Sequence, residues 1–301
     1  MQLSIIIVNW NAGDYLPKCV QSLIKYIKNI EFEIIVIDNN SDDESLKKAE
    51  LAFSDITIVR NKENLGFARA NNIGVQKARG NYVLLLNPDT EIIDDSIERL
   101  HSLFSSSGNI AAAGPVLLNQ QKKPTKEQGN RFPTLFSSFI QFFFLSKLGL
   151  PGVFLEKNPL KPIKTDWICG ACILIKKDIY LSIGGLSEKY FMYAEDMDFC
   201  YRLKQEGLSA MVFPSCRVIH YSKKSIEKQA DQGIVKLQVK SLISFYSDKN
   251  NVYKVVAFKA ILFCGYVLRI AIFSVMGLFK KDQHAKKRLG EAKCILRSIY
   301  D

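Results

Sequence analysis

Short apolar runs alternate with longer mixed segments through the first 117 residues, and this alternation limits the fold more than any other feature. The longer segments carry apolar residues at three- and four-residue spacing, which is typical of helices that bury one face. The run at residues 82–86 is apolar throughout, as expected for a strand buried on both faces of a sheet. Strands that alternate with helices predict an α/β fold with a mostly parallel sheet flanked by helices. We expect strands at residues 3–8, 33–37, 56–59, 82–86 and 110–116, and helices at residues 15–27, 43–53, 66–77 and 94–104.

The regular pattern is lost between residues 122 and 164 and returns afterwards. This stretch mixes Pro, Gly and Lys with an aromatic run at 132–144, so we interpret it as an insertion that is mobile or touches a membrane. Pattern then predicts a strand at 167–175, a helix at 194–206 and two short strands at 210–213 and 217–220. We predict a first domain over residues 1–220 with an insertion at about 120–165, followed by a helical region over residues 221–301.

The positive charge of the chain lies in its C-terminal part. Residues 217–301 carry 17 Lys and Arg against 6 Asp and Glu, whereas residues 1–216 carry 24 of each kind. Such an excess attracts phosphate groups, and the high apolar content of the same part favours lipid over nucleic acid as the partner. The chain opens on a strand-like run without the pattern of an export signal, and its 7 cysteines are scattered. We therefore expect the protein at the cytoplasmic face of the cell membrane.

Residues 255–279 are largely hydrophobic, but Lys259 and Arg269 leave uncharged stretches only at 260–268 and 270–279. A spanning helix needs about 20 apolar residues, and a central Arg opposes insertion. We expect a helix that lies in or dips into the membrane surface; packing on the first domain or in a homodimer is the alternative. The basic side chains expected to face anionic lipid are Lys280, Lys281, Lys286, Lys287 and Arg288.

Polar clusters follow three of the predicted strands. They are Asn-Trp-Asn at 9–11, a run of Asp, Asn and Ser at 38–43, and Asn-Pro-Asp at 87–89. Ligands of open α/β sheets bind beyond the carboxyl ends of the strands, where these clusters would converge. A turn or a helix N-cap explains the second cluster equally well, because Asn, Ser and Asp are favoured at both.

A carboxylate at Asp89 could bind Mg²⁺ or Mn²⁺, which prefer oxygen ligands, although Asn-Pro-Asp is also a good turn sequence. His220 ends a predicted strand, where its imidazole could complete a metal site with Asp89. A lone histidine is more often an ordinary surface or core residue than a metal ligand. Neither Asp89 nor His220 alone therefore identifies a metal site.

Three carboxylates, Glu195, Asp196 and Asp198, stand near the predicted start of one helix. The helix dipole favours acidic residues there, and it does not require the flanking Phe191 and Tyr193. Like-charge coupling and partial desolvation can raise the pKa of one of two adjacent carboxyl groups toward that of a general base. We therefore favour a catalytic role for this segment.

Taken in order, these segments resemble family 2 glycosyltransferases, especially the branch of bacterial rhamnosyltransferases. The resemblance rests on the residues at 5–11, 36–41, 64–67, 86–89, 167–172, 184–186, 191–198 and 219–220. It implies the GT-A fold, with a Rossmann-like sheet and a basic, apolar C-terminal extension. It also implies inverting transfer of a sugar, with dTDP-rhamnose as one donor, to a hydroxyl of a cell-surface polysaccharide or lipid-linked precursor.

The resemblance assigns roles to individual residues. The nucleotide-sugar donor would be held by Val8, Trp10, Asp38, Asn40, Asn64, Gly66, Asn87 and Asp89. A divalent metal, Mn²⁺ or Mg²⁺, would be bound by Asp89 and His220. Asp196 would be the catalytic base with Glu195 beside it, and Trp167 and Gly170 would approach the donor sugar or the acceptor.

One residue departs from the family pattern. The metal motif is often Asp-any-Asp, and Asn87 replaces its first member, which removes one negative charge. We therefore expect weak metal dependence.

Other classes fit the sequence less well. The first predicted strand lacks the Gly-x-Gly-x-x-Gly that follows it in dinucleotide oxidoreductases. A sugar nucleotidyltransferase would carry a Gly-rich basic loop at the same place. A non-catalytic nucleotide-sugar-binding or scaffold protein of the same fold stays open, because it differs only in lacking turnover.

Overall fold

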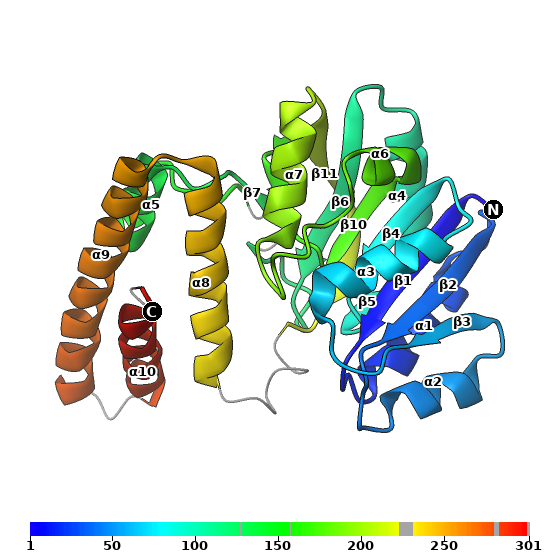
Figure 1. Ribbon diagram of the computed structural model, residues 1–301, viewed down its shortest axis with the longest axis horizontal. Helices are drawn as coiled ribbons and strands as arrows, with labels where there is room; N and C mark the ends of the chain where they lie inside the picture. Colours follow the sequence, from blue (N-terminus) through cyan, green and yellow to red (C-terminus); the bar gives the residue numbers. More distant parts are fainter. Residues whose placement is uncertain (127, 157, 223–230, 280–282, 300–301) are drawn as a thin grey trace. The chain divides into compact units, whose positions relative to one another are not determined.

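The computed structural model describes residues 1–126, 128–156, 158–222, 231–279 and 283–299. The chain forms two compact units. The sheet unit comprises residues 1–131, 155–191 and 195–225, and the helical unit comprises residues 132–154, 192–194 and 226–301. The aromatic middle of the expected insertion therefore groups with the C-terminal region (Figure 1).

The sheet unit is built on one mixed, largely parallel sheet, which confirms the predicted α/β fold. The strand order is β3-β2-β1-β4-β10-β6-β11-β5, with β8 paired to β11. β10 runs antiparallel to β4 and β6, and β5 and β8 run antiparallel to β11. The strands are β1 (Leu3–Asn9), β2 (Phe32–Asp38), β3 (Ile56–Arg60), β4 (Tyr82–Leu86), β5 (Thr90–Ile92), β6 (Ile110–Leu118), β8 (Ile163–Thr165), β10 (Cys172–Lys176) and β11 (Ser209–His220).

Helices cover both faces of this sheet, as the alternation in the sequence predicts. Leu3, Ile5 and Ile7 of β1 belong to the apolar core that includes the buried side of α1, whereas Ile6 points to Gly74 of α3 on the other face. Figure 1 shows α3 lying across β1 and β2. The helices are α1 (Tyr15–Tyr26), α2 (Ser45–Ala52), α3 (Gly66–Lys77), α4 (Ser96–Ser105), α6 (Lys177–Ser182) and α7 (Glu195–Gln205).

Two expected strand assignments are wrong. The strand predicted at 167–175 is divided into β9 (Trp167–Ile168), which pairs with β7 (Gly129–Asn130), and β10. The chain turns between them, and the N–H of Cys172 donates to the carbonyl of Cys169 at 3.3 Å. The two strands predicted at 210–213 and 217–220 are one strand, β11, with a register shift between Phe213 and Arg217.

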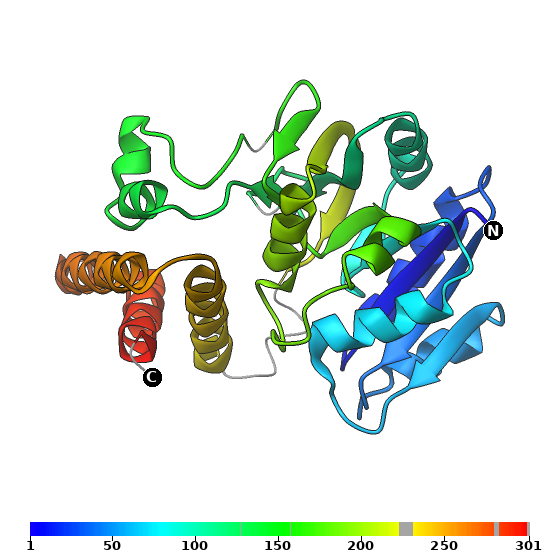
Figure 2. The same ribbon diagram turned by 45° about the horizontal axis from the view of Figure 1, so that its top comes forward.

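The helical unit contains α5 (Leu135–Phe142), a 3₁₀ turn η1 (Leu145–Leu148), α8 (Asp231–Lys249), α9 (Val252–Phe279) and α10 (Gln283–Ser298). Tyr246 of α8 stacks on Phe258 of α9 with ring centroids 4.1 Å apart, and Ile295 of α10 joins the same core. Figure 2 shows α8, α9 and α10 as three adjacent rods.

Among the described residues, α9 is the one helix long and apolar enough to cross a membrane. Its segment Val252–Met276 has a mean hydropathy of 2.1, and 17% of its apolar window is buried. Of the basic residues expected to face lipid, Arg288 is exposed. Lys280 and Lys281 lie outside the described residues, as do the side chains of Lys286 and Lys287.

Candidate functional site

A buried amide at the end of β1 holds the acidic residue at the end of β2. The side-chain amide of Asn9 is fully buried and donates to Asp38 Oδ1 at 2.7 Å. The backbone N–H of Ser41 donates to the second oxygen, Asp38 Oδ2, at 3.1 Å. The parallel register places Asn9 beside Asp38, so the pairing of β1 with β2 creates this contact. Asp38 is thus fixed in one orientation at the carboxyl end of the sheet.

The neighbouring loop is tied to β2 by a second set of amides. The side chain of Asn39 donates to Asn64 Oδ1 and to the carbonyl of Gly66, both at 3.1 Å. Asn61 donates to Asn39 Oδ1 at 2.8 Å. Asn64 in turn accepts from the N–H of Gly66 at 3.0 Å, which orients the first turn of α3.

The start of α3 lies against the segment that leads to the carboxylates. Gly66 has φ +80°, and a Cβ there would lie 2.8 Å from Phe191 Cδ2. The N–H of Phe67 donates to the carbonyl of Phe191 at 2.8 Å. On its other side, the Phe67 ring would be 3.2 Å from a Cβ at Gly170. Glycine at positions 66 and 170 therefore permits close contact among three separate segments.

Asp196 is held at the start of α7 by backbone groups. Its Oδ2 accepts from the N–H of Gly170 at 2.9 Å, and its Oδ1 accepts from the N–H of Met197 at 2.8 Å. Glu195 is buried, and its Oε2 has no hydrogen-bond partner among the described residues. The two adjacent carboxyl groups therefore lie in very different surroundings.

The surroundings of Glu195 and Asp196 decide which of the two carboxyl groups is protonated. Burial raises the pKa of Glu195 well above its usual range, and the charge of Asp196 raises it further. Burial also raises the pKa of Asp196, while the N–H groups of Gly170 and Met197 act in the opposite direction. Hydrogen bonds to a carboxylate favour its charged form, so the proton belongs on Glu195. Asp196 is then an ionised carboxylate of raised basicity, as a general base requires.

The antiparallel pairing of β11 with β5 brings His220 to Asp89. His220 is opposite Thr90 in the register, and its Nε2 lies 3.3 Å from Asp89 Oδ1. The side-chain amide of Asn87 lies 3.4 Å from the same Nε2, and the hydroxyl of Ser222 lies 3.0 Å from Nδ1. Contact with Ser222 orients the ring.

The residues Asp89 and His220 fit a divalent metal. Both side chains are largely buried, at 6% and 11% exposure. A carboxylate oxygen with an imidazole nitrogen suits Mn²⁺, which accepts both kinds of ligand. No third His, Cys, Asp or Glu joins them within the described part of the chain. The remaining positions of a metal would have to be filled by phosphate oxygens or water.

Backbone and side-chain contacts link most of the expected site residues into one continuous set. The N–H of Asn87 donates to the carbonyl of Ala171 at 3.0 Å, next to Gly170, which holds Asp196. The loop at Asn64 and Gly66 joins the same place through Phe67. Asp38, Asp89 and Asp196 therefore belong to one region of the sheet unit.

Four expected residues are not linked to this set by the contacts just described. Val8 is buried near the end of β1, and Trp10 follows that strand half-buried. Asn40 is exposed with φ +59°, a conformation that asparagine tolerates better than most residues. Trp167 pairs with Asn130 through the backbone, and its indole N–H donates to the carbonyl of Arg131 at 3.2 Å.

The sequence prediction placed Asn9, Asn39, Ser41 and Phe67 in the segments of interest but gave none of them a role in the site, although all four support it. A signal for Asn9 was available, since a polar residue at the end of a fully apolar strand must find a buried partner. The contacts of Phe67 connect segments that are far apart in the sequence, and no local pattern marks them.

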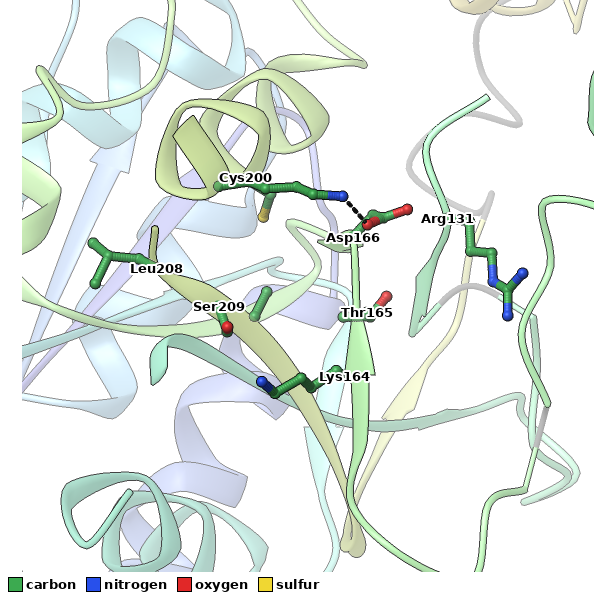
Figure 3. A pocket seen from close by; sticks show the side chains of 9 residues that line it. Arg131, Lys164, Thr165, Asp166, Cys200, Leu208 and Ser209 are labelled. Atoms are coloured by element: carbon green, nitrogen blue, oxygen red, sulfur yellow. Dashed lines mark hydrogen bonds and ion pairs between the residues drawn. The ribbon is translucent and has the colours of Figure 1, made fainter. Parts of the chain in front are cut away.

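A hollow of about 270 Å³ lies elsewhere in the sheet unit, where β11 begins (Figure 3). Lys204, on α7, pairs with Asp166 at 2.8 Å beside it. None of the expected site residues lines this hollow. It is formed by Arg131, Lys164, Thr165, Asp166, Cys200, Lys204, Leu208, Ser209 and Ala210.

Comparisons with known proteins point to one sequence family. The sequence model of Glycosyl transferase family 2 matches residues 4–184. The low-salt glycan biosynthesis hexosyltransferase Agl10 of Haloferax volcanii is 31% identical over 222 residues, which are 72% of this chain and 65% of the relative. The N-acetylglucosaminyl-diphospho-decaprenol L-rhamnosyltransferase of Mycobacterium tuberculosis is 23% identical over 271 residues, which are 83% of this chain and 85% of the relative.

A solved structure supports the fold. The chain is similar to the mannosyltransferase PcManGT of Pyrobaculum calidifontis, solved with GDP-Man and Mn²⁺, with a TM-score of 0.61 at 11% identity. The likeness covers 99% of this chain and 86% of that chain. At this identity the likeness shows the fold, which is of the GT-A type.

The contact of Gly66 with Phe191 yields a prediction for stability. Alanine at a positive φ costs about 1–2 kcal/mol, and Gly66→Ala would in addition press on Phe191. Gly184→Ala is the matched control, because Gly184 has φ +85° and open space around its Cβ position. We expect urea unfolding to show a larger loss of the free energy of unfolding for Gly66→Ala. Equal losses would mean that the contact with Phe191 contributes nothing.

The raised pKa of Glu195 predicts a pH-dependent stability. An unfolded Glu titrates at about 4.3, so above that pH the unfolded chain releases a proton that the folded protein keeps. The free energy of unfolding therefore falls as the pH rises from this value toward the raised pKa. Glu195→Gln removes this loss, so its Tm relative to the unsubstituted protein should increase between about pH 5 and about pH 8.

The control for this measurement is Glu206→Gln, at the exposed position directly after α7. Its Tm difference should be the same at both pH values. A Glu195→Gln difference that does not change with pH would contradict the buried, protonated state.

Proposed function

Because the chain belongs to glycosyl transferase family 2 and is a glycosyltransferase, we propose that it transfers a sugar from a nucleoside diphosphate to an acceptor hydroxyl with inversion. The acceptor in this proposal is a cell-surface polysaccharide or a lipid-linked precursor, and the donor is dTDP-rhamnose. The names of the relatives, a glycan biosynthesis hexosyltransferase and an L-rhamnosyltransferase acting on a diphospho-decaprenol, support this choice.

The observation that carries the proposal is the asymmetric carboxylate pair at the start of α7. Asp196 accepts two backbone hydrogen bonds, while Glu195 is buried without a partner for Oε2. This arrangement keeps one group ionised and the other protonated. An ionised carboxylate of raised basicity beside a nucleotide-sugar site suits deprotonation of a hydroxyl.

In the proposed reaction, Asp196 takes the proton of the acceptor hydroxyl. The acceptor oxygen forms a bond to the anomeric carbon as the bond from that carbon to the diphosphate breaks, and the configuration inverts. Gly170 fixes Asp196 through its N–H and, lacking a side chain, lets the Phe67 ring pack close beside it. Glu195 is the second member of this catalytic pair, and its proton limits the negative charge of the pair.

The donor is placed by groups at the carboxyl ends of the strands. Asp38, oriented by Asn9, accepts hydrogen bonds from the base or ribose, and the loop at Asn64 and Gly66 closes the adjoining side. Val8, Trp10 and Asn40 complete this part of the proposed site. Trp167 contributes at the sugar or acceptor end.

Asp89 and His220 would hold the divalent metal in the proposed site, with Asn87 beside them. Mn²⁺ or Mg²⁺ bound there would neutralise negative charge on the diphosphate. Asn87 contributes no charge, so the site would bind the metal less tightly than a pair of aspartates. The mannosyltransferase structure, which was solved with GDP-Man and Mn²⁺, supports a divalent metal as the cofactor in this proposal.

The helical unit, in the proposed function, attaches the enzyme to the cytoplasmic face of the cell membrane. Its apolar helix α9 and the positive charge of residues 217–301 support a lipid surface as partner. Nucleic acid is not a partner in this proposal. Attachment would place the enzyme beside a lipid-linked acceptor.

The role of Asp196 is tested by Asp196→Asn. We expect kcat to fall at least about 100-fold, with the Kd of the donor unchanged, because the amide cannot accept the proton. The matched control is Asp178→Asn, in the first turn of α6 and exposed, which should retain normal turnover. Near-normal turnover of Asp196→Asn would remove it from its role, and a lack of turnover by the unsubstituted protein would favour a non-catalytic binding protein.

The donor and the metal are tested by thermal unfolding with nucleotide sugars. We expect dTDP-rhamnose to raise the Tm more in the presence of Mn²⁺ than in its absence. His220→Ala should abolish this Mn²⁺-dependent increment and leave the metal-free increment intact. A larger increment with UDP-sugars would overturn the rhamnosyl assignment, and an equal Mn²⁺ increment in His220→Ala would remove His220 from the metal site.

A further inference from the structure

α9 exposes one uncharged stripe along its length. Its exposed side chains recur every three or four positions between residues 256 and 275, which places them on one face of the helix. At 1.5 Å per residue this face is about 30 Å long, close to the thickness of the hydrocarbon core of a bilayer. The exposed positions are Val256, Ala260, Phe263, Cys264, Val267, Leu268, Ala271, Ser274 and Val275.

Arg269 does not lie on this stripe. Its Nη2 donates to the carbonyl of Gln141 at 3.0 Å and its Nε donates to that of Phe142 at 3.4 Å. Both carbonyls belong to the last turn of α5, where backbone acceptors have no partner within the helix and the dipole is negative. The guanidinium also lies 4.4 Å from the ring centroid of Phe144, a favourable cation–π distance.

α5 packs closely on α9 at the same place. Phe142 lies against Gly265, where a Cβ would come within 2.7 Å of Phe142 Cβ. The rings of Phe142 and Tyr266 are 5.6 Å apart. A segment that contains exposed apolar side chains is thereby joined to α9, namely Phe136 at 66%, Phe139 at 41%, Leu148 at 77% and Leu150 at 44% exposure.

We propose that the helical unit is a bilayer-binding element in which α9 contributes its uncharged stripe, the segment around α5 contributes its exposed apolar side chains, and Arg269 stays bound inside the unit. The proposal deepens the membrane attachment in the proposed function and rests on it, but it does not depend on the sugar-transfer chemistry. Of the two charges that interrupt the apolar segment of α9, Arg269 is satisfied by the carbonyls of α5, and Lys259 is half-buried. The aromatic insertion at residues 132–154 and the apolar helix α9 are therefore parts of one membrane-binding element.

The charge of the unit favours an anionic bilayer over a second copy of the chain. Exposed basic side chains of its described part are Lys147, Lys240, Lys254, Arg288, Lys293 and Arg297. Two copies would bring like charges together, whereas anionic head groups attract each basic residue near the surface.

The test is binding of the full chain to vesicles of phosphatidylcholine with and without phosphatidylglycerol. We expect the unsubstituted protein to bind the anionic vesicles more tightly. Val267→Asp places a charge on the stripe at a position 44% exposed and should weaken binding more than about tenfold. The matched control Leu51→Asp, on α2 of the sheet unit and 81% exposed, should leave vesicle binding unchanged.

Each outcome of the vesicle experiment decides for or against the proposal. Unchanged binding by Val267→Asp overturns it, and so does a lipid-free dimer that Val267→Asp dissociates without affecting vesicle binding. Circular dichroism of both variants shows whether they fold. Donor turnover on a soluble acceptor, measured in parallel, separates a failure of the catalytic proposal from a failure of the membrane proposal.

Arg269→Leu tests whether the guanidinium of Arg269 is bound to α5 inside the helical unit. If Arg269 holds α5 on α9, its removal should speed tryptic cleavage at Lys147, which is exposed after α5, without tightening vesicle binding. If Arg269 instead hinders insertion, Arg269→Leu should bind vesicles more tightly with unchanged cleavage. The second result would show that the arginine is not satisfied inside the unit.

Discussion

The two-sided burial of β1 and β4 constrains the rest of the sheet unit. Helices on both faces leave no polar side for these strands, so polar residues can enter them only at their ends. Asn9 is such a residue, and because it is fully buried its amide must find acceptors. It finds Asp38 on the neighbouring parallel strand. The constraint that builds the core thus also orients the carboxylate at the donor end of the site.

Close packing also fixes the carboxylate pair, Glu195 and Asp196. The absence of a side chain at Gly170 lets its N–H reach Asp196, and the close approach at Gly66 brings Phe67 to the same place. Burial of Glu195 without a partner for Oε2 reduces stability near neutral pH, since the folded state must retain a proton. A loss of stability of this kind is typical of functional sites, where the surroundings of a titratable group shift its pKa to suit the chemistry.

Much of the sheet unit could be predicted from the sequence because its determinants are local. Apolar periodicity located the first strands and helices, and the strand-end rule pointed to the clusters at Asp38 and Asp89. The sequence predicts His220 near Asp89, but it does not predict β5, whose three residues are too few for a pattern to emerge and whose pairing with β11 makes the contact. The chain turn at Gly170 was also not predicted, because a continuous apolar run conceals a change of pairing partner from β7 to β4 and β6. Long-range pairing, rather than propensity, decides both.

Arg269 shows why a hydropathy window and a folded structure give different answers. Along the sequence, the residue interrupts an apolar segment and argues against burial of the whole helix in lipid. In the helical unit, carbonyls from a segment more than a hundred positions earlier accept its hydrogen bonds. The energetic cost of a charge depends on the partners that accompany it, not on its position along one helix. Residues 132–154 belong to the same structural unit as α9. The last turn of α5 supplies the carbonyl acceptors for the guanidinium of Arg269.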